Sequence, residues 1–172
     1  MQVSFPGPRI RKTGLAVLIS MIISNFRPGE GLYFYSAIAA IICMQQSVHQ
    51  TYHKGLGRII GTIFGGTMGL IYLLAFPDGS LPDMARLVII AIIVTIIIWI
   101  MAMVNKKDAV SIAGIVFLSV TINHAGDLIP FNFALNRIID TLIGVLVAFF
   151  VNYIDFRIKE KEIPSIKNQK TS

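Results

Sequence analysis

Charged residues are scarce in this sequence. Only 14% of its 172 residues are Asp, Glu, Lys or Arg, whereas 55% are hydrophobic. Because a soluble domain has about 25% charged residues, this composition excludes an ordinary soluble fold and indicates a protein surrounded by a lipid bilayer. The net charge of +6 does not indicate a nucleic-acid partner, since the basic residues stand at the ends of apolar segments and form no basic surface.

The sequence also lacks the short motifs of enzymes and ATP-driven pumps. It contains no P-loop, no HExxH, no GxSxG and no paired CxxC, so neither catalysis nor ATP hydrolysis is expected. Cys43 is the single cysteine and is expected to be a small buried hydrophobe. His49 and His53 are too few ligands for a metal site. No cofactor is expected.

Six apolar segments, separated by polar or turn-forming residues, are long enough to be helices. The segment 87–104 has 18 residues, which suits a helix crossing a hydrocarbon core of about 30 Å. The first segment is expected to be a retained helix and not a cleaved signal peptide, because no cleavage site follows it. The six predicted transmembrane helices cover about residues 10–26, 31–48, 54–74, 87–104, 109–122 and 135–154.

Lysine and arginine are distributed unevenly between the two sides of such a six-helix arrangement. The two ends of the chain and the second and fourth loops carry twelve of these residues, and the other three loops carry three: Arg27, Arg86 and Arg137. Because cytoplasmic loops are enriched in Lys and Arg, both termini are expected in the cytoplasm and the chain in the cell (inner) membrane. Residues 1–155 are predicted to form the transmembrane domain and 156–172 a basic cytoplasmic tail.

Glycines form a regular stripe in the third predicted helix. Such a stripe lies on one helix face and lets another backbone approach closely, which is the usual way in which helices pack in hydrocarbon. The stripe either serves packing alone or lets helices three and six, or two copies of the chain, approach each other. The expected packing glycines of this helix and the sixth are Gly57, Gly61, Gly65, Gly66, Gly69 and Gly144.

A motif in this helix returns in the sixth predicted helix. Arg58-Ile-Ile-Gly-Thr62 is followed 79 residues later by Arg137-Ile-Ile-Asp-Thr141, and the stripe continues there as Asp140, Gly144 and Ala148. Each copy begins the third helix of one half of the predicted bundle, where the halves are helices one to three and helices four to six. Because each half crosses the membrane three times, an odd number, the second half has the opposite orientation in the membrane. The sequence therefore predicts two inverted three-helix repeats, about residues 10–76 and 84–155, as in many membrane transport proteins.

Several blocks of the sequence resemble the aromatic acid exporter family, also called the fusaric-acid-resistance-like membrane domain. They are Gly7-Pro-Arg-Ile-Arg-Lys-Thr-Gly-Leu-Ala16, Ala37-Ile-Ala-Ala-Ile-Ile-Cys-Met-Gln45, the KGLxRxxGTxxGG block from Lys54 to Gly66, and the motif from Arg137 to Gly144.

This resemblance spans about residues 7–155. It implies a six-helix membrane module found in exporters of small aromatic carboxylates and, more distantly, in dimeric malate-conducting channels of plants. Two features depart from the family. Gln46 stands where a proline is expected, and only about 17 residues follow the sixth helix, where many relatives carry a cytoplasmic domain.

Arg58 and Arg137 are the candidate anion-binding residues. Inverted symmetry predicts one arginine at each mouth of a pathway, next to a helix N-terminus that also favours anions. The alternative is that each arginine anchors a helix end at the membrane surface. Asp140 is expected either to pair with Arg137 one turn away or to couple transport to protons. Thr62 and Thr141, which end the two motifs, are assigned to the same pathway.

The expected function is export of small organic or aromatic carboxylate anions across the bilayer, without ATP, by a homodimer. The alternative is a non-transporting membrane subunit or scaffold that uses its glycine-rich helix faces for assembly.

The predicted topology is testable with cysteines introduced one at a time at Asn105 and Ser165. Both positions are expected to react with a membrane-impermeant thiol reagent from the cytoplasmic side alone, because an even number of helices separates each from the N-terminus. A cysteine at Ser80 serves as the control and is expected to react from the opposite side. Labelling of the Asn105 and Ser165 variants from different sides would exclude six crossings.

Overall fold

The computed structural model describes residues 7–27, 33–77, 80, 82–123 and 130–169, and every regular element in these ranges is a helix. This confirms the predicted all-α fold with six helices. Residues 28–32, 78–79, 81 and 124–129 lie outside the described residues, and they include parts of the turns that the sequence predicts at 26–31 and 77–82, and His124. The helices are α1 (Pro8–Asn25), α2 (Tyr33–Cys43), α3 (Val48–Ala75), α4 (Asp83–Met103), α5 (Lys107–Asn123) and α6 (Pro130–Gln169).

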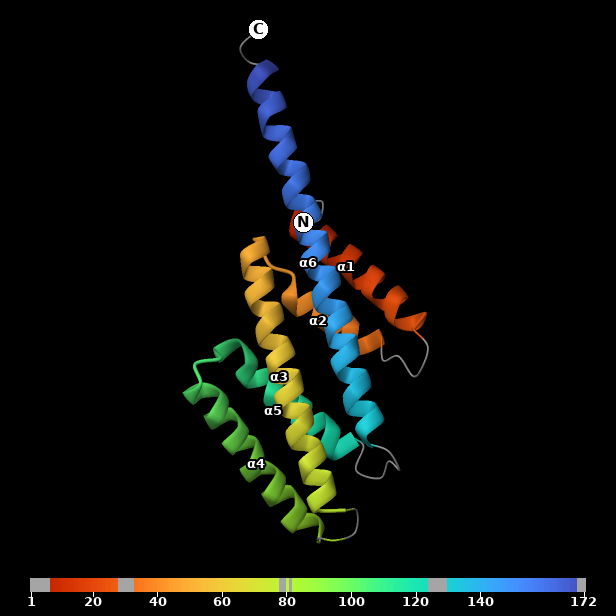
Figure 1. The fold of residues 1–172 in the computed structure, drawn as a ribbon, viewed down its shortest axis with the longest axis vertical. Helices are drawn as coiled ribbons and strands as arrows, with labels where there is room; N and C mark the ends of the chain where they lie inside the picture. The colour runs from red at the N-terminus through yellow and green to blue at the C-terminus, as the bar shows by residue number, and fades with distance from the viewer. Residues whose placement is uncertain (1–6, 28–32, 78–79, 81, 124–129, 170–172) are drawn as a thin grey trace, which may run out of the picture.

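α3 and α6 extend furthest beyond the ends that the apolar pattern predicts. The polar residues before the glycine stripe, expected to form a loop, belong to α3, because Ser47 caps this helix and its Oγ accepts a hydrogen bond of 3.2 Å from the Gln50 backbone N–H. α6 continues past its expected end at residue 154 to Gln169. Its C-terminal end therefore projects beyond the other helices (Figure 1).

Three of the helices are long and apolar enough to cross a membrane: α3, α4 and residues 131–158 of α6. α2 is apolar but has only 11 residues, or about 16 Å at 1.5 Å per residue. Six crossings and the inverted repeat therefore stay predictions. Large apolar side chains face outward along α4, including Leu87, Ile92 and Trp99, as expected of a helix in contact with hydrocarbon.

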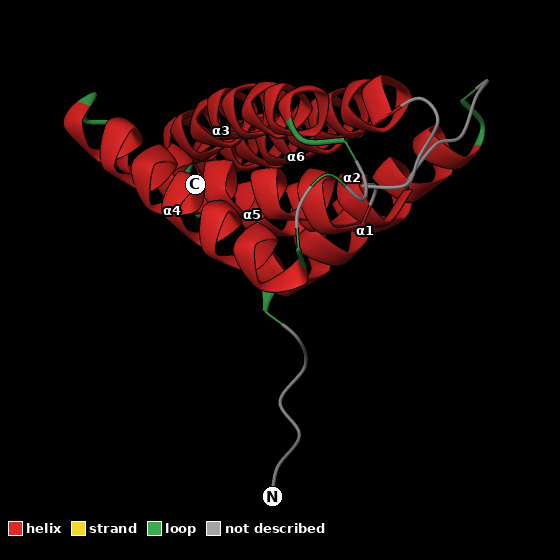
Figure 2. Ribbon diagram, turned by 90° about the horizontal axis from the view of Figure 1, so that it is seen from below, coloured by secondary structure: helices red, strands yellow, loops and turns green. Residues whose placement is uncertain are grey.

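α3 and α6 run antiparallel through the centre of the molecule (Figure 1). Seen along the bundle, α4 and α5 lie on one side of this pair and α1 and α2 on the other (Figure 2). α3 packs against α5, and α6 packs against α1 and α2. α6 therefore packs against the first two helices of the other predicted half, whereas α3 packs against the second helix of the other half, α5.

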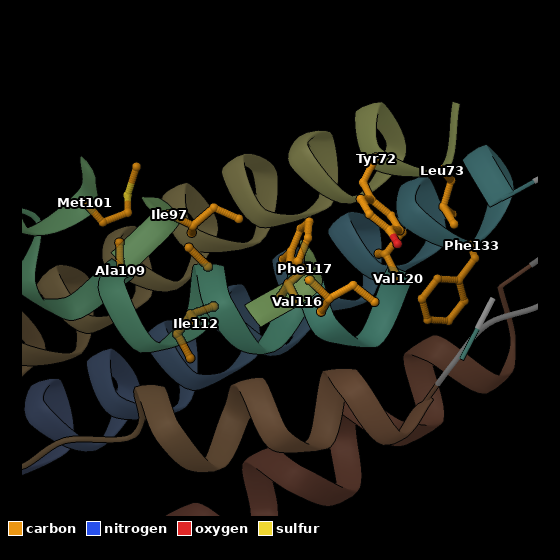
Figure 3. Packing of buried hydrophobic residues seen from close by; sticks show 12 residues of the cluster. Tyr72, Leu73, Ile97, Met101, Ala109, Ile112, Val116, Phe117, Val120 and Phe133 are labelled. Atoms are coloured by element: carbon orange, nitrogen blue, oxygen red, sulfur yellow. The ribbon is translucent and has the colours of Figure 1, made fainter. Parts of the chain in front are cut away.

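Two clusters of buried hydrophobic residues follow this arrangement. The larger one joins α3, α4 and α5 with Phe133 of α6, and its side chains line up along α5 (Figure 3). The smaller one joins α1, α2 and α6 through Ala16, Ala39, Ala40 and Ala148. Small residues in this second cluster bring α2 close to α6.

The glycine stripe of α3 lies against α5. A Cβ atom placed on Gly61 would lie 2.7 Å from the Ala109 backbone O, and one on Gly65 would also meet backbone atoms, those of Ala113. Gly57 and Gly69 face α5 in the same way, whereas Gly66 has more room, with its nearest neighbour at 3.9 Å. The stripe thus joins α3 to α5 within one chain, and not to helix six or to a second copy.

Gly144 makes the corresponding contact in the other part of the bundle. A Cβ atom there would meet the backbone of Ser36 and lie 2.6 Å from the Cβ of Ala39, both in α2. Gly55, outside the stripe, faces α6 instead, where Val145 Cγ1 would be 2.5 Å from an added Cβ. Different glycines therefore serve the contacts of α3 with α5 and of α3 with α6.

Replacing Gly65 with Ala is expected to destabilise the protein by roughly 1–3 kcal/mol, because the added methyl group meets backbone atoms of α5 that cannot rotate away. Gly14→Ala is the matched control, since nothing lies within 4 Å of a Cβ at Gly14. Thermal unfolding of both variants in the same detergent measures the effect. Equal stability of the two variants would contradict the close contact.

Candidate functional site

The two repeated motifs face each other across the contact between α3 and α6. Gly55 and Val145 touch at this contact, which sets the register of the two antiparallel helices. Both helices rise 1.5 Å per residue, and residue numbers increase along α3 in the direction in which they decrease along α6. Arg58 follows Gly55 by three residues and Thr141 precedes Val145 by four, so Arg58 and Thr141 lie at nearly the same level. By the same count Thr62 is level with Arg137.

Both arginines are buried in this central region. Arg58 and Arg137 are each 5% exposed, and Thr62 and Thr141 are 1% and 2% exposed. Two like charges are therefore buried on the neighbouring helices α3 and α6.

This arrangement corrects the expectation of one arginine at each mouth. Arg58 lies ten residues after the start of α3 at Val48, and Arg137 lies seven residues after the start of α6 at Pro130. The helix dipole acts within the first turn, so neither arginine lies at a helix N-terminus. The N-terminal extension of α3 by polar residues moves Arg58 from the expected helix end to the interior.

Arg137 is bound by polar and aromatic groups. Its Nη1 donates a hydrogen bond of 3.1 Å to Ser119 Oγ of α5, and its Cζ lies 3.8 Å from the ring centre of Tyr35 of α2. The Tyr35 hydroxyl lies 3.4 Å from the same Ser119 Oγ. These neighbours orient the guanidinium group and stabilise it by a cation–π contact, but none carries a negative charge that neutralises it.

Arg58 and Thr62 have unused hydrogen-bonding atoms. Arg58 Nε and Thr62 Oγ1 are buried and have no hydrogen-bond partner among the described residues. Helical threonines usually bond back to the carbonyl four residues earlier, as Thr95 does to Ala91 O at 2.9 Å. Thr62 does not, so its hydroxyl is available next to Arg58.

Asp140 is bound to α1 and not to Arg137. One of its oxygens accepts a hydrogen bond of 2.7 Å from Ser24 Oγ, and the other lies 3.6 Å from Arg27 Nη2. Arg27 also donates a hydrogen bond of 3.1 Å to Asn136 Oδ1. The carboxylate, which is fully buried, therefore joins the end of α1 to α6 and leaves Arg137 without a carboxylate in the described part of the chain.

Comparison with known proteins adds to this picture. Residues 15–151 match the model of a family described as fusaric acid resistance protein-like. The match covers most of the chain, including both arginine motifs and all the residues around them. The chain belongs to the fusaric acid resistance protein-like family. It is therefore a membrane protein of a transporter-like family.

One curated relative is the UPF0421 protein YgaE of Bacillus subtilis (strain 168). It is 27% identical to this chain over 148 residues, which are 86% of this chain and 39% of the relative. The chain thus spans about two fifths of that protein's length. No solved structure matches the chain.

Several polar residues of this fusaric acid resistance protein-like chain escape sequence reasoning. Tyr35 and Ser119, which hold Arg137, stand in apolar segments without a motif. Ser24 is recognisable in retrospect, because Ala16, Ser20 and Ser24 repeat the small-residue spacing of four and are all fully buried. That period marks the buried face of α1.

A second polar group ties the ends of four segments together near residue 152. Asn152 of α6, which is 2% exposed, donates a hydrogen bond of 2.8 Å to Thr51 Oγ1 of α3 and accepts one of 2.8 Å from Lys12 Nζ of α1. Asp155 lies 3.0 Å from the same Lys12 Nζ, and Gln45 O accepts a bond from Asn152. Every charge in this group has a counterpart, so it is a structural contact.

His49 and His53 lie on the exposed first turns of α3, with their Nε2 atoms 3.1 Å apart. The described ranges contain no group of three or more residues that could hold a metal ion. Cys43 is fully buried at the end of α2, and it lies close enough to Arg58 for an electrostatic interaction. It therefore marks the α2 side of the arginine region.

Asp140→Asn is expected to destabilise the protein by roughly 3–5 kcal/mol, because it removes the charge that balances partly buried Arg27. Combining it with Arg27→Gln should restore part of the loss in a double-mutant cycle of thermal unfolding. The exposed pair Lys54 and Asp108 is the control, and a double-mutant cycle on this pair should give a coupling energy of at most about 1 kcal/mol. Additive effects of Asp140→Asn and Arg27→Gln would contradict the pairing.

Proposed function

We propose that this chain transports small organic anions, including aromatic carboxylates, across the cell membrane, in the direction of export and without ATP. One observation carries the proposal: Arg58 and Arg137 are both buried where α3 packs against α6, and neither has a carboxylate partner among the described residues. A buried charge without a counter-charge costs several kcal/mol. An anion from outside the chain supplies the missing charge.

The unused atoms beside the arginines fit the same ligand. A carboxylate accepts several hydrogen bonds and is bound most strongly by charged donors. Arg58 Nε and the Thr62 hydroxyl are buried donors without partners, and both are level with the part of α6 that carries Arg137 and Thr141. In this proposal Arg58, Thr62, Arg137 and Thr141 line the anion pathway.

Asp140 has a different role in the proposal. Because it binds Ser24 and Arg27, it does not neutralise the site. Because Asp140 pairs with Arg27, the charge of Arg137 remains available to an anion. Asp140 is therefore a positioning residue that holds α1 against α6.

The proposal includes six crossings in two inverted halves and both termini in the cytoplasm. The antiparallel alignment of the two motifs supports the inverted halves, as do the two core clusters that combine α3 with α4 and α5 and α6 with α1 and α2. The twelve-to-three distribution of Lys and Arg supports the orientation. The expected homodimer also belongs to the proposal, with an interface other than the glycine stripe, since α5 covers that stripe.

The scaffold alternative depends on glycine faces that remain available to other chains. Gly61, Gly65 and Gly144 are all in contact with helices of the same chain, so this observation favours transport.

Uptake of radiolabelled benzoate by proteoliposomes tests the proposal. Arg58→Gln and Arg137→Gln should each lower uptake about 10- to 100-fold, because a hydrogen bond to a charged group contributes about 1.5–3 kcal/mol. Their thermal stability without benzoate should stay equal or rise, because each change removes an unbalanced buried charge. The control is Arg157→Gln, an exposed arginine outside the site.

The stability measurement separates a binding role from a structural one. An arginine that only supports packing would lower the melting temperature when replaced and leave uptake per folded protein unchanged. Wild-type rates in both variants would contradict the pathway. No uptake by the wild-type chain above that of empty liposomes would instead favour the scaffold.

A further inference from the structure

A second polar feature lies away from the arginine region, between the start of α3 and the turn that joins α4 to α5. It is a pocket of about 230 Å³, several times the roughly 30 Å³ that a water molecule occupies in the liquid. Its lining residues come from α3 and from the turn and start of α5: His53, Leu56, Gly57, Ile60, Asn105, Lys106, Lys107, Asp108 and Ala109.

The rim of this pocket carries excess positive charge. Lys106 and Lys107 are both exposed, and no ion pair joins either lysine to another described residue. The one acidic lining residue, Asp108, is occupied by an ion pair with Lys54. Asn105 has a left-handed backbone conformation, with φ of 59°, and this tight turn places the two lysines directly at the start of α5.

Part of the pocket lining is apolar. Leu56 and Ile60 of α3 form one side and Ala109 of α5 the other. The last turns of α4, just before the lysines, expose Trp99 and Met103, which are 62% and 68% exposed. A ligand held by the lysines therefore lies beside apolar surface that is suited to hydrocarbon chains.

We propose that this pocket binds the phosphate head group of an anionic phospholipid, with its acyl chains along the exposed surface of α4. Clusters of Lys and Arg beside membrane-spanning helices attract anionic lipids. Each such residue near the membrane surface increases the affinity for these lipids by a similar factor. Lys106 and Lys107 bind the phosphate, and Leu56 and Ile60 contact the glycerol region. This site does not depend on the proposed transport of organic anions.

Native mass spectrometry of the full chain in detergent tests the site, with phosphatidylglycerol compared with phosphatidylethanolamine. The wild type is expected to retain phosphatidylglycerol preferentially. The double variant Lys106→Gln/Lys107→Gln should weaken this retention on the order of 20-fold, from about five-fold for each lysine. Leu56→Trp should weaken it too, because the larger side chain fills the pocket without changing the charge.

The matched control removes two exposed arginines at the same end of the bundle. Arg11→Gln/Arg157→Gln changes the net charge equally and should leave the preference for phosphatidylglycerol intact. A similar loss in this control would show general attraction to basic residues and overturn the site, as would undiminished binding by the lysine variant. Displacement of the lipid by millimolar inorganic phosphate would identify a site for free phosphate and overturn the lipid assignment.

Discussion

The close approach of backbones at small residues is the constraint on which the bundle depends. Gly61 and Gly65 bring α3 against the backbone of α5, and Gly144 brings α6 against that of α2. In hydrocarbon no hydrophobic effect draws helices together, so close packing has to supply the attraction. With α3 fixed on α5 and α6 fixed on α2, the two long helices meet in the middle, and the arginine motifs come level with each other.

The polar side chains of this interior fall into two kinds. Lys12 and Asp155, and Arg27 and Asp140, are matched pairs that tie α1 to α6. Arg58 and Arg137 are buried too, but no carboxylate pairs with either among the described residues. A buried charge without a counter-charge is costly, whereas the charges of the two pairs balance each other. This contrast separates the candidate site from the structural contacts around it.

The sequence predicted the helices well, because long apolar segments and turn residues are local signals. It placed the start of α3 too late, since the residues before Lys54, including His49 and His53, are polar, whereas the helix begins after the Ser47 cap. That error put Arg58 at a helix end. The repeated motif identified Arg58, Thr62, Arg137 and Thr141 as one group, but their neighbours Tyr35, Ser119 and Ser24 come from helices whose contacts no local pattern encodes. The sequence also does not show which helix packs against the glycine stripe. A stripe indicates that another backbone comes close, but the identity of that helix depends on the tertiary structure.

The exchange of third helices between the halves sets an order for biosynthesis. When the ribosome has completed α1 and α2, their small-residue faces still lack α6, which begins 87 residues after the end of α2. The glycine-rich face of α3 likewise stays uncovered until α5 has been synthesised. During translation the faces of α1 and α2 are exposed to lipid or to the insertion machinery, so a truncated chain that ends before residue 130 can complete the contact of α3 with α5 but not the contacts of α1 and α2 with α6. A split protein made from two halves should accordingly recover its fold only when both fragments are present in the same membrane.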